Sequence, residues 1–185
     1  MRRQTTWWKR ALGVQAPYRW NLRRLRLGFT LDIGCGIGRN LVNLDGHAVG
    51  IDHNSEAVSM AVDRGLTAFT PDEFNRSKFA SPEIFDSLLA AHVIEHLSRQ
   101  DALELLRTHL PYVRDAGTIV LITPQERGFR SDPSHVDFVD FSALKTISHD
   151  VGLTAQRSYS FPFPRAFGKI FTYNEFVLVA AKSPG

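Results

Sequence analysis

A glycine turn and a following acid are the residues in this sequence best suited to holding a cofactor. Residues 31–38, with the sequence LDIGCGIG, end an apolar segment in a turn that has glycine at every second position. Because glycine has no Cβ, the backbone of such a turn can come within van der Waals distance of a ligand. The next apolar segment ends at Asp52, whose carboxylate is placed to hold two ribose hydroxyls. This pattern predicts a nucleotide-cofactor site, for either a dinucleotide or S-adenosylmethionine (SAM).

The spacing of the turn favours SAM over a dinucleotide. A dinucleotide fingerprint has the form G-x-G-x-x-G with an acid about 20 residues further on. Here the turn is G-x-G-x-G, Asp32 precedes it inside the strand, and Asp52 comes early. A pyrophosphate would also seek the free amides of a helix N-terminus, whereas SAM carries an ammonium group, which an acid beside the turn suits.

Three histidines, His92, His96 and His135, lie at or near expected strand ends and are the candidate catalytic residues. If SAM serves as a methyl donor, transfer from its sulfonium is an in-line displacement, for which a protein mainly has to align donor and nucleophile about 3 Å apart. If the acceptor is a hydroxyl, an imidazole can take its proton near neutral pH. Structural hydrogen bonding is the alternative role for each ring.

The same segment has the spacing of a metal site. His92, Glu95 and His96 stand at i, i+3 and i+4, and His135 can supply a fourth ligand. The alternative is that these side chains hold no metal. We favour the alternative without a metal; loss of activity with a chelator and recovery with a divalent ion would be needed to keep the metal.

The elements that position these residues alternate between short apolar runs and helical patterns, which predicts an α/β fold. We expect a Rossmann-like, doubly wound, mostly parallel sheet with helices on both faces. Ligands of such sheets lie outside the carboxyl ends of the strands, where the strand order reverses. A capping box at Ser98 and Asp101, and glycine stops at Gly65 and Gly152, mark helix ends. The seven expected strands are Leu27–Ile33, Ala48–Ile51, Thr67–Phe69, Phe85–Val93, Thr118–Ile122, Thr154–Ser160 and Phe176–Ala181.

Composition places the chain among cytoplasmic globular proteins. Its 185 residues, 43% of them hydrophobic, suffice for one domain with a proper core. The single cysteine, Cys35, excludes a disulfide framework and a thiolate metal cluster. No apolar run approaches the roughly 18 residues of a spanning helix, and the basic N-terminus lacks the apolar region of a signal peptide.

Residues 1–26 form a basic aromatic arm or lid, followed by the main domain at 27–185. The arm carries eight arginines and lysines and no acid, so the rest of the chain has a net charge of 3 − 8 = −5. Trp7, Trp8, Tyr18 and Trp20 are interleaved with these cations. Such an arm fits nucleic acid, an anionic membrane surface or a phosphorylated substrate; the alternative is a segment that docks its aromatic rings and leaves its charges in water.

From Leu27 onward the motifs resemble the class I SAM-dependent methyltransferases, and among them the small ubiquinone-biosynthesis-type O-methyltransferases. The resemblance rests on residues 31–38, Asp52, the segment 91–97 (AHVIEHL) and the strand 117–124 (GTIVLITP). It implies that SAM is the methyl donor and S-adenosylhomocysteine (SAH) the product. The metal-ligand spacing is also similar to that of the small-RNA 2′-O-methyltransferases, where an acid usually stands in place of His92.

The resemblance also implies which residues contact SAM. Asp32 and the loop backbone surround the methionine part, Asp52 takes the ribose hydroxyls, and His53 lies against the adenine. Asp72 follows the third strand, where the family often has an acid for the adenine amino group. Tyr18 and Arg19 reach SAM from the arm. The full expected set is Tyr18, Arg19, Asp32, Gly34, Cys35, Gly36, Gly38, Asp52, His53, Asp72, Glu73, Phe74, Ala91 and His92.

We expect an enzyme that methylates a hydroxyl of a small metabolite, glycan or lipid-like acceptor, with an amine or carboxylate as second choices. The alternatives are an RNA methyltransferase that uses the arm, and a non-catalytic SAM-binding or interaction module. Three segments can determine specificity: the arm, the loop 125–140 and the Pro-Phe segment 161–167, which forms a stiff apolar wall. The sequence identifies neither the acceptor nor the oligomeric state.

Overall fold

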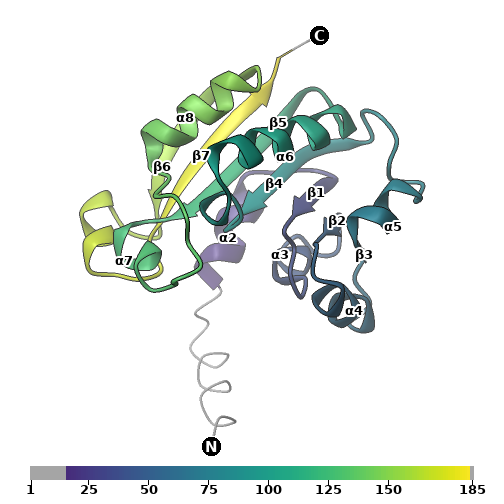
Figure 1. Ribbon diagram of the computed structural model, residues 1–185, viewed down its shortest axis with the longest axis horizontal. Helices are drawn as coiled ribbons and strands as arrows, with labels where there is room; N and C mark the ends of the chain where they lie inside the picture. The colour runs from purple at the N-terminus through teal and green to yellow at the C-terminus, as the bar shows by residue number, and fades with distance from the viewer. Residues whose placement is uncertain (1–15, 184–185) are drawn as a thin grey trace, which may run out of the picture.

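Seven strands form one sheet in the order β3-β2-β1-β4-β5-β7-β6 (Figure 1). The computed structural model describes residues 16–183. β7 is antiparallel to β5 and β6, and the other paired strands are parallel, which confirms the expected doubly wound, mostly parallel sheet. The strand order reverses between β1 and β4. The strands are β1 (Thr30–Ile33), β2 (Ala48–Ile51), β3 (Ala68–Phe69), β4 (Phe85–Ala91), β5 (Val113–Pro124), β6 (Leu153–Phe161) and β7 (Glu175–Lys182).

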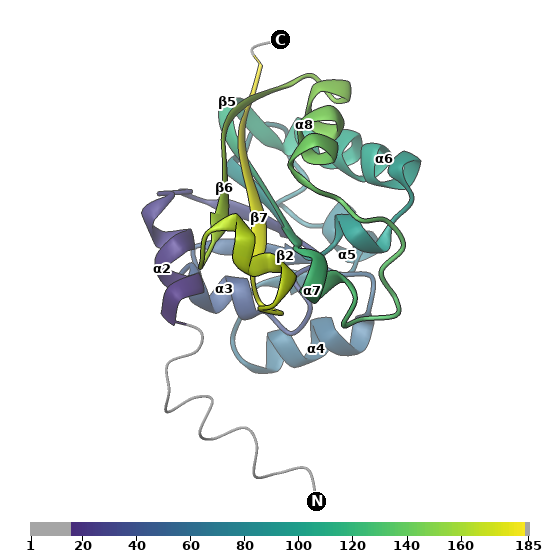
Figure 2. The same cartoon turned by 90° about the vertical axis from the view of Figure 1, so that its left-hand side faces the viewer.

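Helices cover both faces of the sheet, with α2 and α3 on one side and α5, α6 and α8 on the other (Figure 2). The α-helices are α2 (Ala16–Arg24), α3 (Arg39–Asn43), α4 (Ser55–Asp63), α5 (Pro71–Asn75), α6 (Arg99–His109), α7 (Glu126–Phe129) and α8 (Phe141–Asp150). Within residues 16–183, three 3-10 helices join or extend these elements: η1 (Ile94–His96), η2 (Leu110–Tyr112) and η3 (Arg165–Lys169).

The expected helix ends are present, although one cap differs in detail. The side chain of Ser98 accepts a hydrogen bond from the backbone of Asp101, as a capping residue should. Its hydroxyl also donates to the Asp101 carboxylate at 2.6 Å, a contact within the cap that the sequence motif did not specify. Gly65 and Gly152 both have left-handed φ values, +78° and +76°, which suit the residue after a helix.

Six of the seven expected strands differ from the observed bounds, four of them by only one or two residues at an end and two by more. The first begins at Thr30 instead of Leu27, because Arg26 and Gly28 adopt left-handed φ values of 52° and 65° and turn the chain. The fifth extends from Val113 to Pro124 instead of covering only 118–122. Its longer carboxyl end carries the chain further toward the loops that follow.

The largest apolar cluster fills the space between the sheet and the α5, α6 and α8 layer, and includes Phe74, Phe85, Leu106 and Leu144. On the opposite face, Leu22 of α2 packs with residues of β4, β5 and β7. The part of the arm from residue 16 on is therefore a helix joined to the core; Trp7 and Trp8 lie outside the described residues. Among residues 16–183, no helix has the length and apolarity needed to cross a membrane.

Candidate active site

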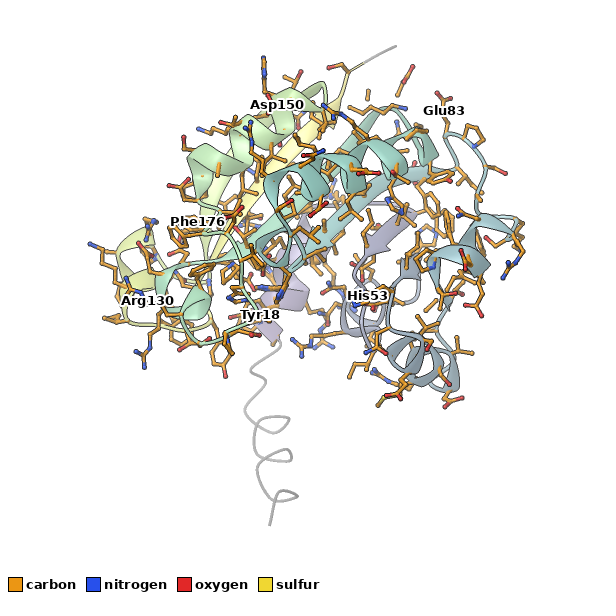
Figure 3. The ribbon with its side chains drawn as sticks, in the orientation of Figure 1. Tyr18, His53, Glu83, Arg130, Asp150 and Phe176 are labelled. Carbon is orange, nitrogen blue, oxygen red and sulfur yellow. The ribbon has the colours of Figure 1, made fainter. Side chains whose placement is uncertain are left out.

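The loops that follow β1, β2 and β4 lie next to one another at one edge of the sheet, because β1 pairs with both other strands. Figure 3 shows Tyr18 and His53 at this edge, and Glu83 and Asp150 at the opposite one. The carboxyl ends of parallel strands beside a reversal of strand order are where α/β proteins bind ligands.

The glycine loop is tied to β2 and leaves room at one position. The amides of Gly34 and Cys35 both donate to the carbonyl of Ile51, at 2.8 and 3.1 Å. Gly34 has φ +69°, and a Cβ there would lie 2.3 Å from Val93 Cγ2. A Cβ on Gly36 would meet no protein atom within 4 Å. One glycine therefore lets the loop pack against the β4 turn, and the other borders open space.

Cys35 and Gly38 complete the loop. Cys35 is buried, and a Cβ on Gly50 would lie 2.5 Å from its Sγ, so the thiol fills the gap that this glycine leaves. Burial raises the pKa of Cys35 to about 12, which keeps the thiol neutral. Gly38 has φ +80° and stands at the N-cap of α3.

Asp52 is held with both carboxylate oxygens oriented. Oδ2 accepts from the Gly36 amide at 2.7 Å, and Oδ1 accepts from the Asn54 amide at 2.9 Å. Each carboxylate oxygen can accept a further hydrogen bond, which fits two adjacent ribose hydroxyls. The neighbouring His53 has an almost fully exposed side chain.

Asp32 is a buried acid with an oxygen that has no partner. Oδ1 is 3.5 Å from Asn40 Nδ2, and Oδ2 has no hydrogen-bond partner among the described residues. Burial raises the pKa of Asp32 to about 7; the Asn40 contact opposes this rise and the charge of Asp52 adds to it. A buried carboxylate is costly unless a cation or donor pairs with it. Asp32, Asp52 and the opening at Gly36 therefore fit the ammonium, ribose and methionine parts of SAM.

The three expected residues after β3 are placed differently from one another. Glu73 accepts from the amide and the hydroxyl of Thr70, both at 2.8 Å, and these bonds lower the pKa of Glu73. Phe74 is buried in the core beside Tyr112. The cap explains Glu73 and core packing explains Phe74, which leaves the exposed Asp72 as the side chain open to a ligand.

His92 follows β4 and Ala91 in a left-handed conformation with φ 59°. Its Nδ1 is 3.2 Å from Glu95 Oε1 and its Nε2 is 2.9 Å from Glu175 Oε1. Burial alone would lower the pKa of His92, but the two carboxylates outweigh it and raise the pKa to about 10. Both ring nitrogens are engaged, and a protonated ring has no lone pair. The geometry therefore disfavours His92 as a base and favours a ring that links two acids.

Tyr18 reaches the same edge from α2. Its hydroxyl donates to the carbonyl of Tyr173 at 2.7 Å, and burial together with the nearby Glu175 raises its pKa. Arg19 is exposed. Sequence reasoning missed Glu175, whose one available signal was an acid at the start of the apolar run 176–181.

Glu95, His96 and His135 come together as a second cluster. One ligand atom from each lies within 4.8 Å of those from the other two. The amide of Val136 donates to the Glu95 carbonyl at 2.7 Å, which ties the loop after β5 to η1. Of the four expected ligands, His92 is the one that lies outside this group.

The two segments expected to border the acceptor are fastened together. Arg165 of η3 pairs with Glu126 of α7 through two hydrogen bonds, of 2.8 and 2.5 Å. Buried Gln125 and Asn174 are hydrogen-bonded to each other at 3.0 Å, and both contact Ser160. Figure 1 shows α7 beside the turn between β6 and β7. These contacts hold the apolar segment 161–167 in place against α7.

Two hollows are lined mainly by other residues, although Glu73 lines the first and Ile94 of η1 lines the second. One is bordered by α4, β3 and α5, and the other by α6, α8 and residues 137–140. Neither is lined by Asp32, Asp52 or His92. The candidate site is therefore defined by its side chains and backbone, not by either of these hollows.

Comparisons with known proteins agree with this assignment. The family model described as "Methyltransferase domain" matches residues 18–172. A SAM-dependent methyltransferase from Archaeoglobus fulgidus has a similar structure, with a TM-score of 0.66, 19% identity, and coverage of 94% of this chain and 97% of that one. Magnesium protoporphyrin IX methyltransferase from Synechocystis, solved with bound SAH, gives a TM-score of 0.63, 16% identity, and coverage of 92% and 82%.

A methyltransferase from Haloferax volcanii in complex with the activator Trm112 gives a TM-score of 0.69, 15% identity, and coverage of 95% and 94%. No curated protein matches the sequence. The family match extends over most of the chain and includes α2, the glycine loop and η3. The chain therefore belongs to the methyltransferase-domain family and is a SAM-dependent methyltransferase, as its motifs predicted.

Proposed function

We propose that this enzyme transfers the methyl group of SAM to a hydroxyl of a small, partly apolar acceptor. The observation that carries the proposal is the neighbourhood of His135, at the same sheet edge as the cofactor residues. His135 Nδ1 lies 2.7 Å from the carbonyl of Phe129 and must donate to it. Nε2 then holds the ring's lone pair and can accept the proton of a hydroxyl.

The surroundings of this ring support a small acceptor. Phe129 stacks on His135 with ring centroids 5.2 Å apart, and Phe138 lies across Phe129 at 5.3 Å. Across the loops, Phe163 and Phe167 are partly exposed and 5.5 Å apart. An aromatic border favours an acceptor with an apolar face, such as a lipid-like molecule or one face of a sugar.

When SAM is bound, it supplies an activated methyl group, so the protein has little bond chemistry of its own to perform. Asp52 and Asp32 bind and orient the donor, and the Gly36 backbone leaves room for it. His135 holds the acceptor proton, while the aromatic border excludes water. Tyr18 closes the edge on the side of β7.

The test is methyl transfer from labelled SAM to matched acceptors that carry a hydroxyl, an amine or a carboxylate on one aromatic scaffold. We expect a product with the hydroxyl compound whose label resists mild alkali, as an ether does. Label released by mild alkali would indicate a carboxylate acceptor, and label on the amine would also overturn the proposal. His135→Gln should lower turnover, whereas the matched change at exposed His149 on α8 should not.

RNA methylation is a second candidate because α2 carries three exposed arginines, of which Arg19 is the sequence neighbour of Tyr18. The same assay with RNA separates the two, since RNA binding should weaken steeply between about 50 and 200 mM salt. A non-catalytic module would bind SAM in calorimetry and transfer no label to any acceptor.

A further inference from the structure

We propose that Glu95, His96 and His135 bind a divalent transition-metal ion of the zinc type. The three residues come from η1 and from the loop after β5, 39 positions apart for His96 and His135. Each offers a ligand atom, and the three atoms lie within 4.8 Å of one another. A triangle of this size can contract around one ion through small side-chain rotations, since zinc–nitrogen and zinc–oxygen bonds are about 2.0–2.2 Å.

The carboxylate of Glu95 points to a cation independently of this convergence. The residue is fully buried, and Oε1 is engaged by His92 at 3.2 Å. Oε2 has no hydrogen-bond partner among the described residues. His92 compensates the carboxylate at Oε1, but a buried oxygen such as Oε2 is unfavourable without a donor or cation of its own. A metal ion at the triangle would be that cation.

Both imidazoles are held as metal ligands usually are. His135 Nδ1 donates to the Phe129 carbonyl at 2.7 Å, and His96 Nδ1 faces the carbonyl and hydroxyl of Ser134 at 3.3 and 3.2 Å. Donation from Nδ1 leaves the lone pair on Nε2. A metal-ligating histidine commonly donates its other nitrogen to a carbonyl in this way, which fixes the ring and its tautomer.

The ligand chemistry selects the kind of ion. Mg²⁺ and Ca²⁺ prefer oxygen ligands, whereas two imidazoles with one carboxylate suit Zn²⁺ and other transition metals. Three protein ligands also leave at least one coordination position open, which is the arrangement of catalytic zinc sites. His92 does not close that position, because both its nitrogens contact Glu95 and Glu175.

The open position gives the ion a role in the proposed methyl transfer, and this second step rests on the proposed hydroxyl acceptor. With the ion bound, His135 Nε2 is a ligand and no longer takes the acceptor proton. Instead the acceptor oxygen binds the ion, which lowers the pKa of the hydroxyl, and the proton leaves to solvent. The oxygen then forms a bond to the methyl carbon as the carbon–sulfur bond of SAM breaks. The products are the methyl ether, SAH and one proton.

The test begins with binding of Co²⁺ to protein freed of metal by a chelator, followed by absorbance and calorimetry. We expect one Co²⁺ per chain, displaced by Zn²⁺ and not by excess Mg²⁺. His96→Gln and His135→Gln should each weaken binding at least tenfold, and Glu95→Gln should do the same. His149→Gln is the matched control, because its side chain is 91% exposed on α8, and it should bind like the unaltered protein.

Equal Co²⁺ binding in the His135→Gln and His149→Gln variants would overturn the proposal, as would displacement by Mg²⁺. Glu95 is buried, so its variant is used only if its melting and SAM affinity match the unaltered protein. Histidine modification read by mass spectrometry gives a measurement without any variant. Zn²⁺ should protect His96 and His135 and leave His53 and His149 reactive; modification of all four at equal rates would again contradict the site.

These outcomes separate the metal site from the proposed function. Specific Co²⁺ binding without methylation of any hydroxyl compound would leave the site standing and remove the hydroxyl acceptor. Full hydroxyl methylation by metal-free protein, with no specific Co²⁺ binding, would leave the function standing and remove the site.

Discussion

The donor side and the acceptor side of this site are built in different ways. On the donor side, residues of one short stretch, 32–54, hold each other through backbone groups, as in the bonds from the Gly36 and Asn54 amides to Asp52. On the acceptor side, side chains far apart in sequence meet, as His92 does with Glu175. The donor side is therefore a local structure, and the acceptor side depends on the whole sheet.

This difference has a consequence for function. The donor side, made of the glycine loop with Asp32 and Asp52, contacts only SAM, and SAM is the same molecule whatever the acceptor. The acceptor side is made of side chains from η1, the loop after β5, and β7. These side chains can change one at a time without disturbing the glycine loop, Asp32 or Asp52. Changes on the donor side should therefore alter SAM affinity, and changes on the acceptor side should alter turnover at constant SAM affinity.

The largest expected effect is that of Gly34→Ala. The new Cβ would lie 2.3 Å from Val93 Cγ2, at a residue with φ +69°. Overpacking and a left-handed alanine together should cost about 2 to 4 kcal/mol of folding free energy and abolish tight SAM binding. Denaturant unfolding and calorimetry measure the two effects.

Gly36→Ala is the matched change, because its Cβ would meet no protein atom within 4 Å. It should lose about 1 to 2 kcal/mol of stability from the left-handed conformation alone, yet still weaken SAM binding. Equal stability losses in the two variants would contradict the different roles of these glycines.

Asp52→Ala should weaken SAM binding by about 1 to 3 kcal/mol, because the ribose hydroxyls lose a charged partner. The Gly36 and Asn54 amides also lose their acceptor, so the loop should be less ordered. Calorimetry with SAM is the measurement, and Glu83→Ala, at the opposite edge of the sheet, is the control. An unchanged affinity in Asp52→Ala would remove this residue from the site.

Asp32 should make SAM binding depend on pH. With its pKa raised to about 7, the carboxyl is ionised at pH 8 and largely protonated at pH 6. The ammonium group of SAM loses its partner on protonation, so affinity at pH 6 should fall about tenfold below its plateau near pH 7.5 to 8. Asp32→Asn should bind SAM weakly with no such dependence between these values.

The same residue should lower the stability of the free protein above neutral pH. The pKa of Asp32 in the folded protein lies above its unfolded value of about 3.9. The folded protein therefore loses free energy of unfolding as pH rises from about 4 to about 7, and the loss is complete above pH 7. Asp32→Asn should therefore melt higher than the unaltered protein at pH 8, by about 1 to 3 kcal/mol in free energy, and the gain should shrink at pH 5. A variant that melts lower at pH 8 would contradict this explanation.

The contrast also explains how far the sequence predicted the molecule. The glycine loop, Asp52 and the seven strands follow from local patterns, since strand ends and turns leave marks in contiguous residues. Helix α2 has three arginines among its nine residues, and Leu22 is its one buried apolar side chain, so its packing left no periodic signal. Glu175 and Asn174 became functional candidates only once the antiparallel pairing of β7 placed them beside Gln125 and His92.

The smallest expected effect is the most specific to the acceptor side. Glu175→Gln keeps an oxygen near His92 Nε2 and removes the charge, while Glu95 still holds the other nitrogen. Because the ring keeps one anchor, we expect turnover to fall by no more than about tenfold, with SAM affinity within about twofold of the unaltered protein. Glu83→Gln, at the opposite edge of the sheet (Figure 3), is the matched control.

A merely structural role for Glu175 would lower melting temperature and both kinetic constants together, whereas positioning of the acceptor edge lowers kcat alone. Glu175→Asp tests the same point from the other direction. It restores the charge on a shorter side chain, so its turnover should lie between those of Glu175→Gln and the unaltered enzyme. Glu175→Gln could instead weaken SAM binding as strongly as Asp52→Ala does. That result would show that His92 couples the two sides of the site, and it would contradict the separation between the donor side and the acceptor side.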